Sequence, residues 1–322
     1  MRAAIYEQSG SSDVLKVSEV ERPEPGPGEV RVRVRWSGVN PTDWKSRAGL
    51  TGGAPEGSQI PNQDGSGHID AVGAGVDSAR VGQAVWVYLA AAGRRWGTAA
   101  EWTVVPAERA VPLPAGVSLE LGAMLGVPAI TAYHCCQAGG LIEGANVLVA
   151  GGAGAVGHFA IELARFGGAR VAATASTPEK ADLACQAGAE VVVDYREPDA
   201  AALLGAFASP FDRIVEVALG ANFALDLALS GPGTVIVTYA SEAQDPLLPV
   251  RRCMTANVTL QFVLLYNIGV AALRAATDGV STALAAGALS ELPIHRFPLD
   301  DIAAAHDAVQ SGATGKVLVD LG

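Results

Sequence analysis

The segment Asn146–Gly157, Asn-Val-Leu-Val-Ala-Gly-Gly-Ala-Gly-Ala-Val-Gly, decides the fold of this 322-residue chain. Its first part, Val147–Ala150, is a short apolar run of the kind that forms a buried parallel strand. Glycines then recur at every third position, at Gly151, Gly154 and Gly157, and a helical pattern follows as far as two consecutive glycines. The segment therefore predicts a strand, a glycine turn and a helix, which together make the first half of a βαβ unit.

The glycines of this turn have separate physical roles. Gly151 permits a tight turn off the strand, Gly154 lets the backbone approach a pyrophosphate, and Gly157 lets the helix pack closely on the strand. The N-terminus of the helix offers free N–H groups and a partial positive charge to phosphates. A second strand at Arg170–Ala173 and a third at Glu190–Val193 follow, with a helix between them. We therefore predict a dinucleotide-binding domain.

The end of the second predicted strand distinguishes the two nicotinamide dinucleotides. An NAD site places Asp or Glu about 20 residues after the glycine turn, where it holds the ribose 2′-hydroxyl. No carboxylate stands at the tip of this strand, where the chain reads Thr-Ala-Ser-Thr. Ser176 can donate a hydrogen bond to a 2′-phosphate, and Lys180 follows one helical turn later as a positive charge. These residues favour NADP(H), although Lys180 as a solvated surface lysine is the alternative.

Charge and composition exclude several classes of function. The formal net charge is −11 with no basic cluster to offset it, which argues against nucleic acid and anionic membrane surfaces as partners. No apolar run reaches membrane-spanning length, and the first residues form a strand pattern rather than a signal peptide. The four cysteines have neither disulfide nor metal-ligand spacing. We expect a cytoplasmic protein that acts on a small molecule.

The chain divides into two predicted domains. Residues 1–125 contain short strands punctuated by glycines, which predict a small, strongly bent barrel. Residues 126–266 alternate strand and helix, which predicts a doubly wound parallel sheet, and the break at Gly126-Val127-Pro128 marks the boundary. Residues 267–322 are too short to form a domain alone, so we expect them to fold back onto the barrel. In this tail we predict two helices, at Ile268–Ala276 and Ser281–Ala286, followed by a strand, a helix and a final strand.

Several motifs together resemble the medium-chain dehydrogenase/reductase superfamily, in particular its zinc-independent quinone oxidoreductase (zeta-crystallin-like) branch. The resemblance covers essentially the whole chain. Besides the glycine turn, the motifs are Gly38-Val39-Asn40-Pro41-Thr42-Asp43, Asp64-Gly65-Ser66-Gly67, Pro128-Ala129-Ile130-Thr131-Ala132-Tyr133, Asp194-Tyr195-Arg196-Glu197 and Ser311-Gly312-Ala313-Thr314-Gly315-Lys316. The resemblance implies an α/β protein with a GroES-like bent β-barrel catalytic domain and a Rossmann cofactor domain.

Three departures from the zinc-dependent relatives predict that no metal is bound. Those relatives have a cysteine in place of Asn40 and a His-Glu pair in place of Gln63-Asp64, and they insert a four-cysteine lobe near residues 88–97 that this chain lacks. Catalytic zinc takes three N, S or carboxylate ligands, and Asn and Gln are poor ligands. Without a Lewis acid, reduction of a simple ketone lacks its main assistance, whereas a quinone or an α,β-unsaturated carbonyl spreads the charge of an incoming hydride by conjugation.

The resemblance also implies a set of residues that contact the cofactor. These are Gly154, Ala155, Val156 and Gly157 at the pyrophosphate, Ser176, Lys180 and Tyr195 at the 2′-phosphate, Asn222 at a ribose or phosphate, Tyr239 and Ala240 at the nicotinamide ribose, and Asn40 and Thr131 at the nicotinamide. Phe262 completes the predicted cofactor set and, with Trp44, Trp96 and Tyr266, is a candidate for the apolar lining of a cleft. Each of these aromatic residues could instead belong to the core.

Asn40 and Lys45 are the predicted catalytic residues. Several quinone reductases have tyrosine at the position of Lys45, beside the nicotinamide and the substrate. A lysine there could donate a hydrogen bond to a carbonyl or transfer a proton. It could equally contact a cofactor phosphate or lie on the solvated surface, so the change leaves the substrate open.

The apolar segment Val258–Leu265 lies at the end of the predicted sheet. An exposed edge of this kind invites pairing with another chain, and the family resemblance implies a homodimer joined through it. The short-chain dehydrogenases, another family of hydride-transfer enzymes, are excluded because none of the six tyrosines has a lysine four residues later.

Three functions remain open from the sequence. The first is an NADPH:quinone oxidoreductase, with the quinone held in the interdomain cleft. The second is an NADPH-dependent reductase of enone or 2-alkenal double bonds on the same scaffold. The third, of another class, is a non-catalytic NADPH-binding protein with a structural or regulatory role. The residues alone predict an NADP(H)-dependent oxidoreductase without a metal, and the more specific reaction class is implied only by the family resemblance.

Overall fold

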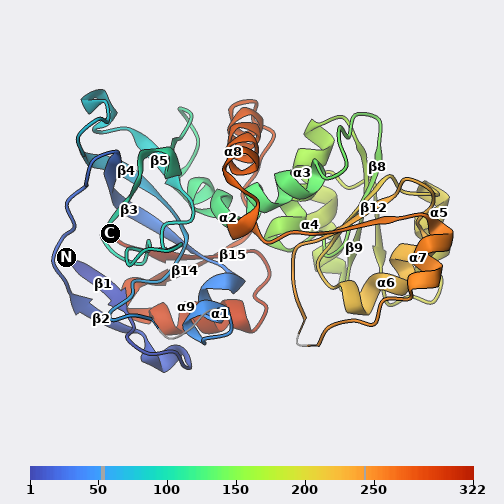
Figure 1. The fold of residues 1–322 in the computed structure, drawn as a ribbon, viewed down its shortest axis with the longest axis horizontal. Helices are drawn as coiled ribbons and strands as arrows, with labels where there is room; N and C mark the ends of the chain where they lie inside the picture. The colour runs from blue at the N-terminus through green and yellow to red at the C-terminus, as the bar shows by residue number, and fades with distance from the viewer. Residues whose placement is uncertain (52–54, 243) are drawn as a thin grey trace. The chain divides into compact units, whose positions relative to one another are not determined.

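The computed structural model describes residues 1–51, 55–242 and 244–322, which form two compact units (Figure 1). Unit 1 comprises Met1–Val127 and Glu291–Gly322, and unit 2 comprises Pro128–Ser290. The predicted division placed the return to the first domain at residue 267, whereas the chain returns to unit 1 only at residue 291. The difference is the helix α8 (Val270–Ala285), which packs against α3 (Ala155–Phe166) inside unit 2.

Unit 1 is a bent barrel whose strands pair mainly in antiparallel, with a parallel pair formed by its two C-terminal strands. Its main sheet has the order β14-β15-β3-β4-β5-β7, with β6 also paired to β3, while β1 and β2 form a separate hairpin. The strands are β1 (Arg2–Ile5), β2 (Lys16–Glu19), β3 (Glu29–Val39), β4 (Asp64–Val72), β5 (Ala84–Val87), β6 (Trp102–Pro106), β7 (Ala110–Pro112), β14 (Ile294–Pro298) and β15 (Lys316–Asp320). The helices are α1 (Pro41–Arg47) and α9 (Ile302–Gln310), with short 3-10 turns at Ser12–Val14, Ser78–Arg80, Ala107–Arg109 and Leu299–Asp301.

The long strand β3 organises the barrel. One of its edges pairs with β6 along Glu29–Arg33 and with β15 along Trp36–Val39, while the other edge pairs with β4. Two register shifts in the β3–β4 ladder bend the strands, as bulges do. Gly67 of β4 lies so close to the Arg33 carbonyl that a Cβ atom there would overlap it. The pairing of β15 with β3 confirms that the C-terminal tail folds back onto the N-terminal barrel.

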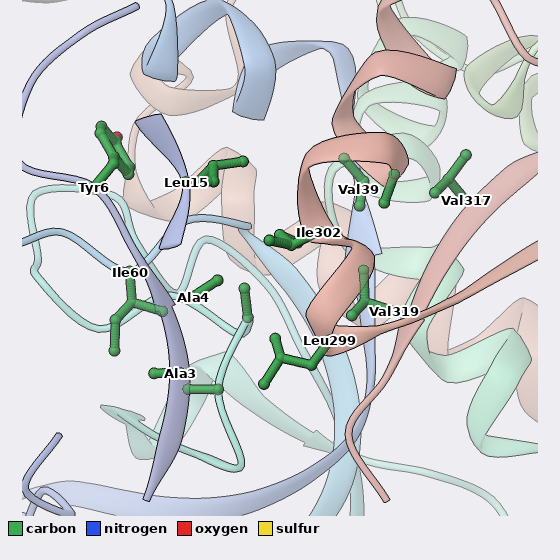
Figure 2. Packing of buried hydrophobic residues seen from close by; sticks show 13 residues of the cluster. Ala3, Ala4, Tyr6, Leu15, Val39, Ile60, Leu299, Ile302, Val317 and Val319 are labelled. Atoms are coloured by element: carbon green, nitrogen blue, oxygen red, sulfur yellow. The ribbon is translucent and has the colours of Figure 1, made fainter. Parts of the chain in front are cut away.

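A hydrophobic core of unit 1 joins segments from both ends of the chain. Figure 2 shows Ala3 and Ala4 of β1, Ile302 of α9 and Val317 and Val319 of β15 in this cluster. All five are at most 2% exposed. Burial of one such valine or isoleucine contributes about 1.5–3 kcal/mol, so the C-terminal segment is an integral part of this core.

Unit 2 is a doubly wound parallel sheet, as the sequence predicts. Its strand order is β10-β9-β8-β11-β12-β13, and every neighbouring pair is parallel. The strands are β8 (Asn146–Val149), β9 (Arg170–Ala175), β10 (Val191–Asp194), β11 (Arg213–Glu216), β12 (Val235–Thr238) and β13 (Thr259–Phe262). The helices, besides α3 and α8, are α4 (Pro178–Gln186), α5 (Ala200–Phe207), α6 (Leu219–Ala228) and α7 (Val250–Ala256), and a 3-10 turn covers Leu265–Asn267.

Helices cover both faces of this sheet (Figure 1). Leu148 of β8 and Ile214 of β11 pack in one cluster with Leu204 of α5 and Phe223 of α6. On the opposite face the turn after β8 brings Gly152 against Ile161 of α3, as well as against α4. Strands buried on both faces explain why the sequence shows continuous apolar runs here rather than alternation.

Two predicted helix breaks are wrong. The helix α2 (Leu119–Cys136) continues through Gly126 and Pro128, where the sequence predicted an interruption, and it crosses from unit 1 to unit 2. The Val127 N–H donates to both carboxylate oxygens of Asp64, and Gly126 leaves room for that carboxylate, because a Cβ atom there would overlap it. The glycine serves close packing rather than a turn.

The second wrong break lies in α8, which runs through Gly279 as one helix of 16 residues. A Cβ atom at Gly279 would overlap the ring of Tyr133, so this glycine too is required for helix packing. The predicted edge strand Val258–Leu265 is also shorter than expected. The strand β13 ends at Phe262, because the chain turns into the 3-10 segment Leu265–Asn267. Within the described residues no helix is long and apolar enough to cross a membrane.

Candidate functional sites

The carboxyl ends of the six parallel strands in unit 2 lie along one edge of the sheet. The chain builds β8, β9 and β10 outward in one direction and then β11, β12 and β13 in the other, so the direction reverses between β8 and β11. Ligands of doubly wound sheets bind at the carboxyl edge beside such a switch point. The predicted cofactor residues Ser176, Tyr195, Tyr239 and Phe262 lie at or just beyond the ends of β9, β10, β12 and β13.

The glycine turn after β8 fits a bound phosphate. Gly154 is exposed and is the N-cap of α3, and no side chain caps that helix end. A Cβ atom at Gly154 would make only an ordinary contact with the Gly151 carbonyl, whereas one at Gly157 would overlap it. The free N–H groups at Ala155 and Val156, which are half-buried, are therefore left for a ligand. The close packing at Gly157 is the role that the sequence predicted, whereas the pyrophosphate contact at Gly154 stays a prediction.

The tips of β9 and β10 carry a cationic group that the sequence analysis did not select. Ser176 and Lys180 are half-buried, and Tyr195 is 40% exposed. The Arg196 guanidinium donates to the Ser176 carbonyl and pairs with Asp194. Hydrogen bonds from Arg196 hold the pKa of Asp194 low, at about 2.

Arg196 thus places a cation at the end of β9, where an NAD site would have a carboxylate, and Lys180 follows on α4. A sequence signal existed, because Arg196 belongs to the motif Asp194-Tyr195-Arg196-Glu197. Only the parallel pairing of β9 with β10 brings the guanidinium to Ser176.

The end of β11 holds two buried carboxyl groups that sequence reasoning also missed. Asn222 donates through Nδ2 to Glu216 Oε1 at 3.0 Å, so the predicted cofactor residue turns back toward the strand end. Glu216 also accepts from the Ala218 N–H. Asp226 lies on α6, and burial followed by the charge of Glu216 raises the pKa of Asp226 to about 9. Burial also raises the pKa of Glu216.

The remaining predicted cofactor residues of unit 2 occupy neighbouring strands and α2. Tyr239 and Ala240, both half-buried, follow β12, and burial raises the pKa of the Tyr239 phenol. Thr131 is buried on α2. Phe262 ends the outermost strand, three strands along from β8, and is 67% exposed. Their cofactor contacts stay predictions.

Unit 1 contains a buried polar cluster around Asn40, the predicted catalytic residue. Asn40 follows β3, Asp64 begins β4 and Lys316 begins β15, and all three are at most 2% exposed. The amide Nδ2 of Asn40 donates to Asp64 Oδ2 at 2.6 Å, and the Lys316 ammonium donates to Asn40 Oδ1 at 2.5 Å. The ammonium also lies 3.9 Å from Asp64 Oδ2. Lys316 ends the motif that begins at Ser311, but the motif alone predicts no role for this lysine.

The carboxylate of Asp43 extends this cluster at the start of α1. It accepts from the backbone N–H groups of Asn40 at 2.7 Å and Gln63 at 3.1 Å. Burial raises the pKa of Asp64 to about 6 against the opposing pull of Lys316. Burial, and then the charge of Asp64, raise the pKa of Asp43 to about 8. Burial lowers the pKa of Lys316.

These donors do not fit a zinc ion. Asp64 is the single carboxylate at the positions where zinc-dependent relatives have ligands, and both its oxygens accept from the Val127 N–H. Gln63 Oε1 accepts from the Ala91 N–H. The Lys316 ammonium already holds Asn40 Oδ1, and zinc prefers thiolate, imidazole and carboxylate over amides. Nor do the described residues include any group of three or more His, Cys, Asp and Glu side chains that could hold a metal ion.

The second predicted catalytic residue, Lys45, lies on α1 and is half-buried. Its ammonium is 5.9 Å from the centroid of the Trp44 ring, a cation–π distance. Trp96 packs against the core of unit 1. The structure thus does not bring Lys45 into the cluster around Asn40, and its catalytic role stays a prediction.

Comparisons with known proteins agree with these two units. Residues 26–115 match the alcohol dehydrogenase GroES-like domain, and residues 155–282 match the family described as zinc-binding dehydrogenase. The quinone oxidoreductase of Homo sapiens is 27% identical over 325 residues, covering 99% of this chain and 97% of that protein. A chloroplastic quinone-oxidoreductase homologue of Spinacia oleracea is 31% identical over 251 residues, covering 72% of this chain and 75% of that protein.

A solved structure extends the comparison to the fold. The thermostable alcohol dehydrogenase of Pyrobaculum aerophilum superposes with a TM-score of 0.85 at 29% identity, and the match covers 99% of each chain. The relatives named are dehydrogenases and reductases, so the chain is an oxidoreductase that uses a nicotinamide cofactor. With its GroES-like barrel and its Rossmann-type parallel sheet, the protein belongs to the medium-chain dehydrogenase/reductase superfamily.

Proposed function

We propose that this oxidoreductase is an NADPH-dependent, zinc-independent quinone reductase. The observation that carries the proposal is the cluster of Asn40, Asp64 and Lys316. The amides of Asn40 and Gln63 stand where zinc-dependent relatives have metal ligands, and the Lys316 ammonium donates to the Asn40 amide, so the hydride acceptor has to be one that needs no Lewis acid. A quinone fits because conjugation spreads the added charge over two oxygens. The names of the curated relatives support the same acceptor class.

The preference for NADPH rests on charge at the tips of β9 and β10. Lys180 and Arg196 supply two cations, Ser176 supplies a hydroxyl, and the end of β9 has no carboxylate. A 2′-phosphate can accept charge-assisted hydrogen bonds from such groups, whereas a ribose hydroxyl lacks the carboxylate acceptor that NAD sites provide. Asp194 already pairs with Arg196 and keeps that guanidinium in place.

The chemistry divides between the cofactor and the chain. When bound, the nicotinamide supplies the hydride. The glycine turn and the N-terminus of α3 hold the pyrophosphate and so fix the position of the cofactor. We assign to the Asn40 amide the donation of a hydrogen bond to a carbonyl oxygen of the bound quinone or nicotinamide, which stabilises negative charge that develops there.

The test is NADPH oxidation by purified, EDTA-treated protein with benzoquinone, phenanthrenequinone and pentenone as acceptors, and with NADH in place of NADPH as the control. Turnover with a quinone that prefers NADPH and survives EDTA is the expected result. Turnover with pentenone alone would replace the quinone with an enone double bond as the acceptor. Loss of turnover in EDTA that added zinc restores would refute the metal-free mechanism.

We also propose that the protein is a homodimer joined through β13. The outer edge of this strand is the end of the sheet, and the exposed apolar side chains nearby include Met254 (75% exposed), Phe262 (67%) and Leu264 (55%). A free edge flanked by apolar side chains favours strand pairing with a second copy. Light scattering that gives the mass of a monomer at micromolar concentration would reject this proposal.

A further inference from the structure

The buried polar cluster in unit 1 fixes the orientation of the Asn40 side-chain amide. An asparagine side chain has a carbonyl oxygen that only accepts and an NH₂ group that only donates. The Lys316 ammonium, which only donates, contacts one end of this amide, and the Asp64 carboxylate, which accepts, contacts the other. A flipped amide would set donor against donor and acceptor against acceptor, so the neighbours decide the orientation.

The two neighbours are themselves held in place. The Val127 N–H donates to both oxygens of Asp64, at 2.9 and 3.0 Å. A Cβ atom at Gly126 would overlap the same carboxylate, and one at Gly38 would lie 3.2 Å from the Lys316 side chain. Because the backbone packs this closely around both groups, neither can move away to let the amide turn.

We propose that Lys316 and Asp64 are positioning residues that lock the Asn40 amide, so that it presents an N–H group to a bound carbonyl oxygen. The second N–H of Nδ2 is the donor that this arrangement leaves for the ligand. Because Lys316 draws on the oxygen of the same amide, it also polarises that N–H and strengthens its hydrogen bond. In this arrangement a lysine and an amide together provide the electrophilic assistance that a metal gives in related enzymes. The inference rests on the proposed function of Asn40.

Exchanging the residues at positions 40 and 64 distinguishes a positioning role of Asp64 and Lys316 from a merely structural one. Asn40→Asp removes the donor and adds a carboxylate to a cluster that already holds Asp43 and Asp64, so we expect a lower Tm together with a large loss of activity. The double variant Asn40→Asp/Asp64→Asn keeps the net charge and reverses the polarity of the pair, since the amide at position 64 now donates to the carboxylate at position 40. That carboxylate also still accepts from Lys316.

We expect the double variant to regain part of the lost Tm, because the amide at position 64 keeps one oxygen for the Val127 N–H, and to bind NADPH like the wild type. Its kcat should stay lower by about 100-fold, the usual loss when one donor to a developing oxyanion is removed. KM for the quinone should change far less than kcat. Asp77→Asn, at an exposed aspartate of unit 1, is the matched control and should change neither Tm nor kcat.

Two outcomes would overturn the inference. If the exchange restores none of the Tm that Asn40→Asp loses, the amide has no fixed orientation and the lock is wrong. If the exchange restores Tm and kcat together, Asn40 is only structural. Should Asn40→Asp not fold alone, Asp64→Asn and the double variant provide the comparison. A wild type that reduces no quinone would refute the proposed function, whereas the Tm cycle would still decide the lock.

A second variant addresses Lys316 directly. Gln at this position can donate or accept, so Lys316→Gln releases the amide of Asn40 while it keeps a polar side chain in the cluster. We expect kcat to fall by about 10-fold or more while the NADPH dissociation constant stays within about 2-fold, because no charge on the cofactor is involved. An unchanged kcat would show that the ammonium neither orients nor polarises the amide.

Discussion

The pair of buried carboxyl groups at the end of β11 makes the stability of unit 2 depend on pH. Glu216 and Asp226 are at most 1% exposed, and their side chains interact with each other. Among the described residues, neither Glu216 Oε2 nor Asp226 Oδ2 has a hydrogen-bond partner outside this pair. Burial and the neighbouring charge raise the pKa of Asp226 to about 9. At neutral pH the folded protein therefore keeps a proton on this pair, which the unfolded chain releases above about pH 4.

The sign and size of the effect follow from proton linkage. A carboxyl group whose pKa is raised by folding contributes stability that is complete below its unfolded pKa and is lost as pH rises through its folded pKa. Between about pH 4 and 9 the free energy of unfolding should therefore fall by about 1.4 kcal/mol per pH unit for this one proton. Asp226→Asn removes the proton while its amide can still donate to Glu216.

From about pH 5.5 to 8.5 the stability of the variant relative to the wild type should rise by as much as about 4 kcal/mol. For a unit of this size each kcal/mol shifts Tm by about 2–4 °C, so the difference in Tm should grow by roughly 8 °C or more. Thermal melts at constant ionic strength, followed by circular dichroism, measure it. Asp182→Asn, at an exposed aspartate of α4, is the control. Parallel Tm curves for Asp226→Asn and the wild type would refute the shared proton.

Three further outcomes are expected. Lys180→Ala and Arg196→Ala should each lower the ratio of kcat/KM for NADPH to kcat/KM for NADH by about 10-fold or more, because each removes one charge-assisted hydrogen bond. An unchanged ratio would show that the substituted cation does not contact the 2′-phosphate. Gly279→Ala should cost about 1–2 kcal/mol despite the higher helix propensity of alanine, because the new methyl group meets the Tyr133 ring, and a raised Tm in a thermal melt would contradict this packing. Phe262→Glu should give a monomer by light scattering without loss of Tm at low protein concentration, whereas an unchanged dimer mass would place the interface elsewhere.

Local sequence patterns could predict those parts of the fold whose cause is local. The glycine turn after β8 and the strand Glu29–Val39 follow from backbone geometry and alternation, and the structure has both. The sequence predicts a break at Gly126-Val127-Pro128, and a gap that contains Gly279 between the helices Ile268–Ala276 and Ser281–Ala286. In the structure each of these two glycines makes room for a group distant in sequence, Asp64 in one case and Tyr133 in the other. No local pattern reveals such a partner.

The same distinction applies to the candidate sites. Asn40 and the glycine turn could be found from motifs, because motifs preserve short spacing. Lys316 lies 276 positions from Asn40, and its burial depends on the pairing of β15 with β3. Arg196 reaches Ser176 through the β9–β10 pairing. Charged residues are normally exposed, so from sequence alone a surface position was the better expectation for both.

The buried carboxyl groups of the cluster around Asn40 and of the pair at the end of β11 change the free energy of unfolding with pH in the same direction. Asp43, Asp64 and Asp226 all have raised pKa values, so each contributes stability that is lost as pH rises. The net charge of −11 adds self-repulsion that grows over the same range. Lys316 has a lowered pKa and acts oppositely, but only between its folded pKa and its ordinary value of 10.5.

Stability should therefore be greatest on the acid side of neutrality and fall toward pH 9. These acids lie beside the Asn40 amide and at the end of β11, which are the positions that we assign to carbonyl activation and cofactor binding. Burying polar groups at these positions lowers the stability of the fold. In return, a fixed hydrogen-bond donor stabilises developing charge more strongly where water is excluded than it does in solvent. Asp226→Asn should accordingly raise stability at alkaline pH relative to the wild type, and substitutions that disturb the Asn40 amide should lower the rate of hydride transfer.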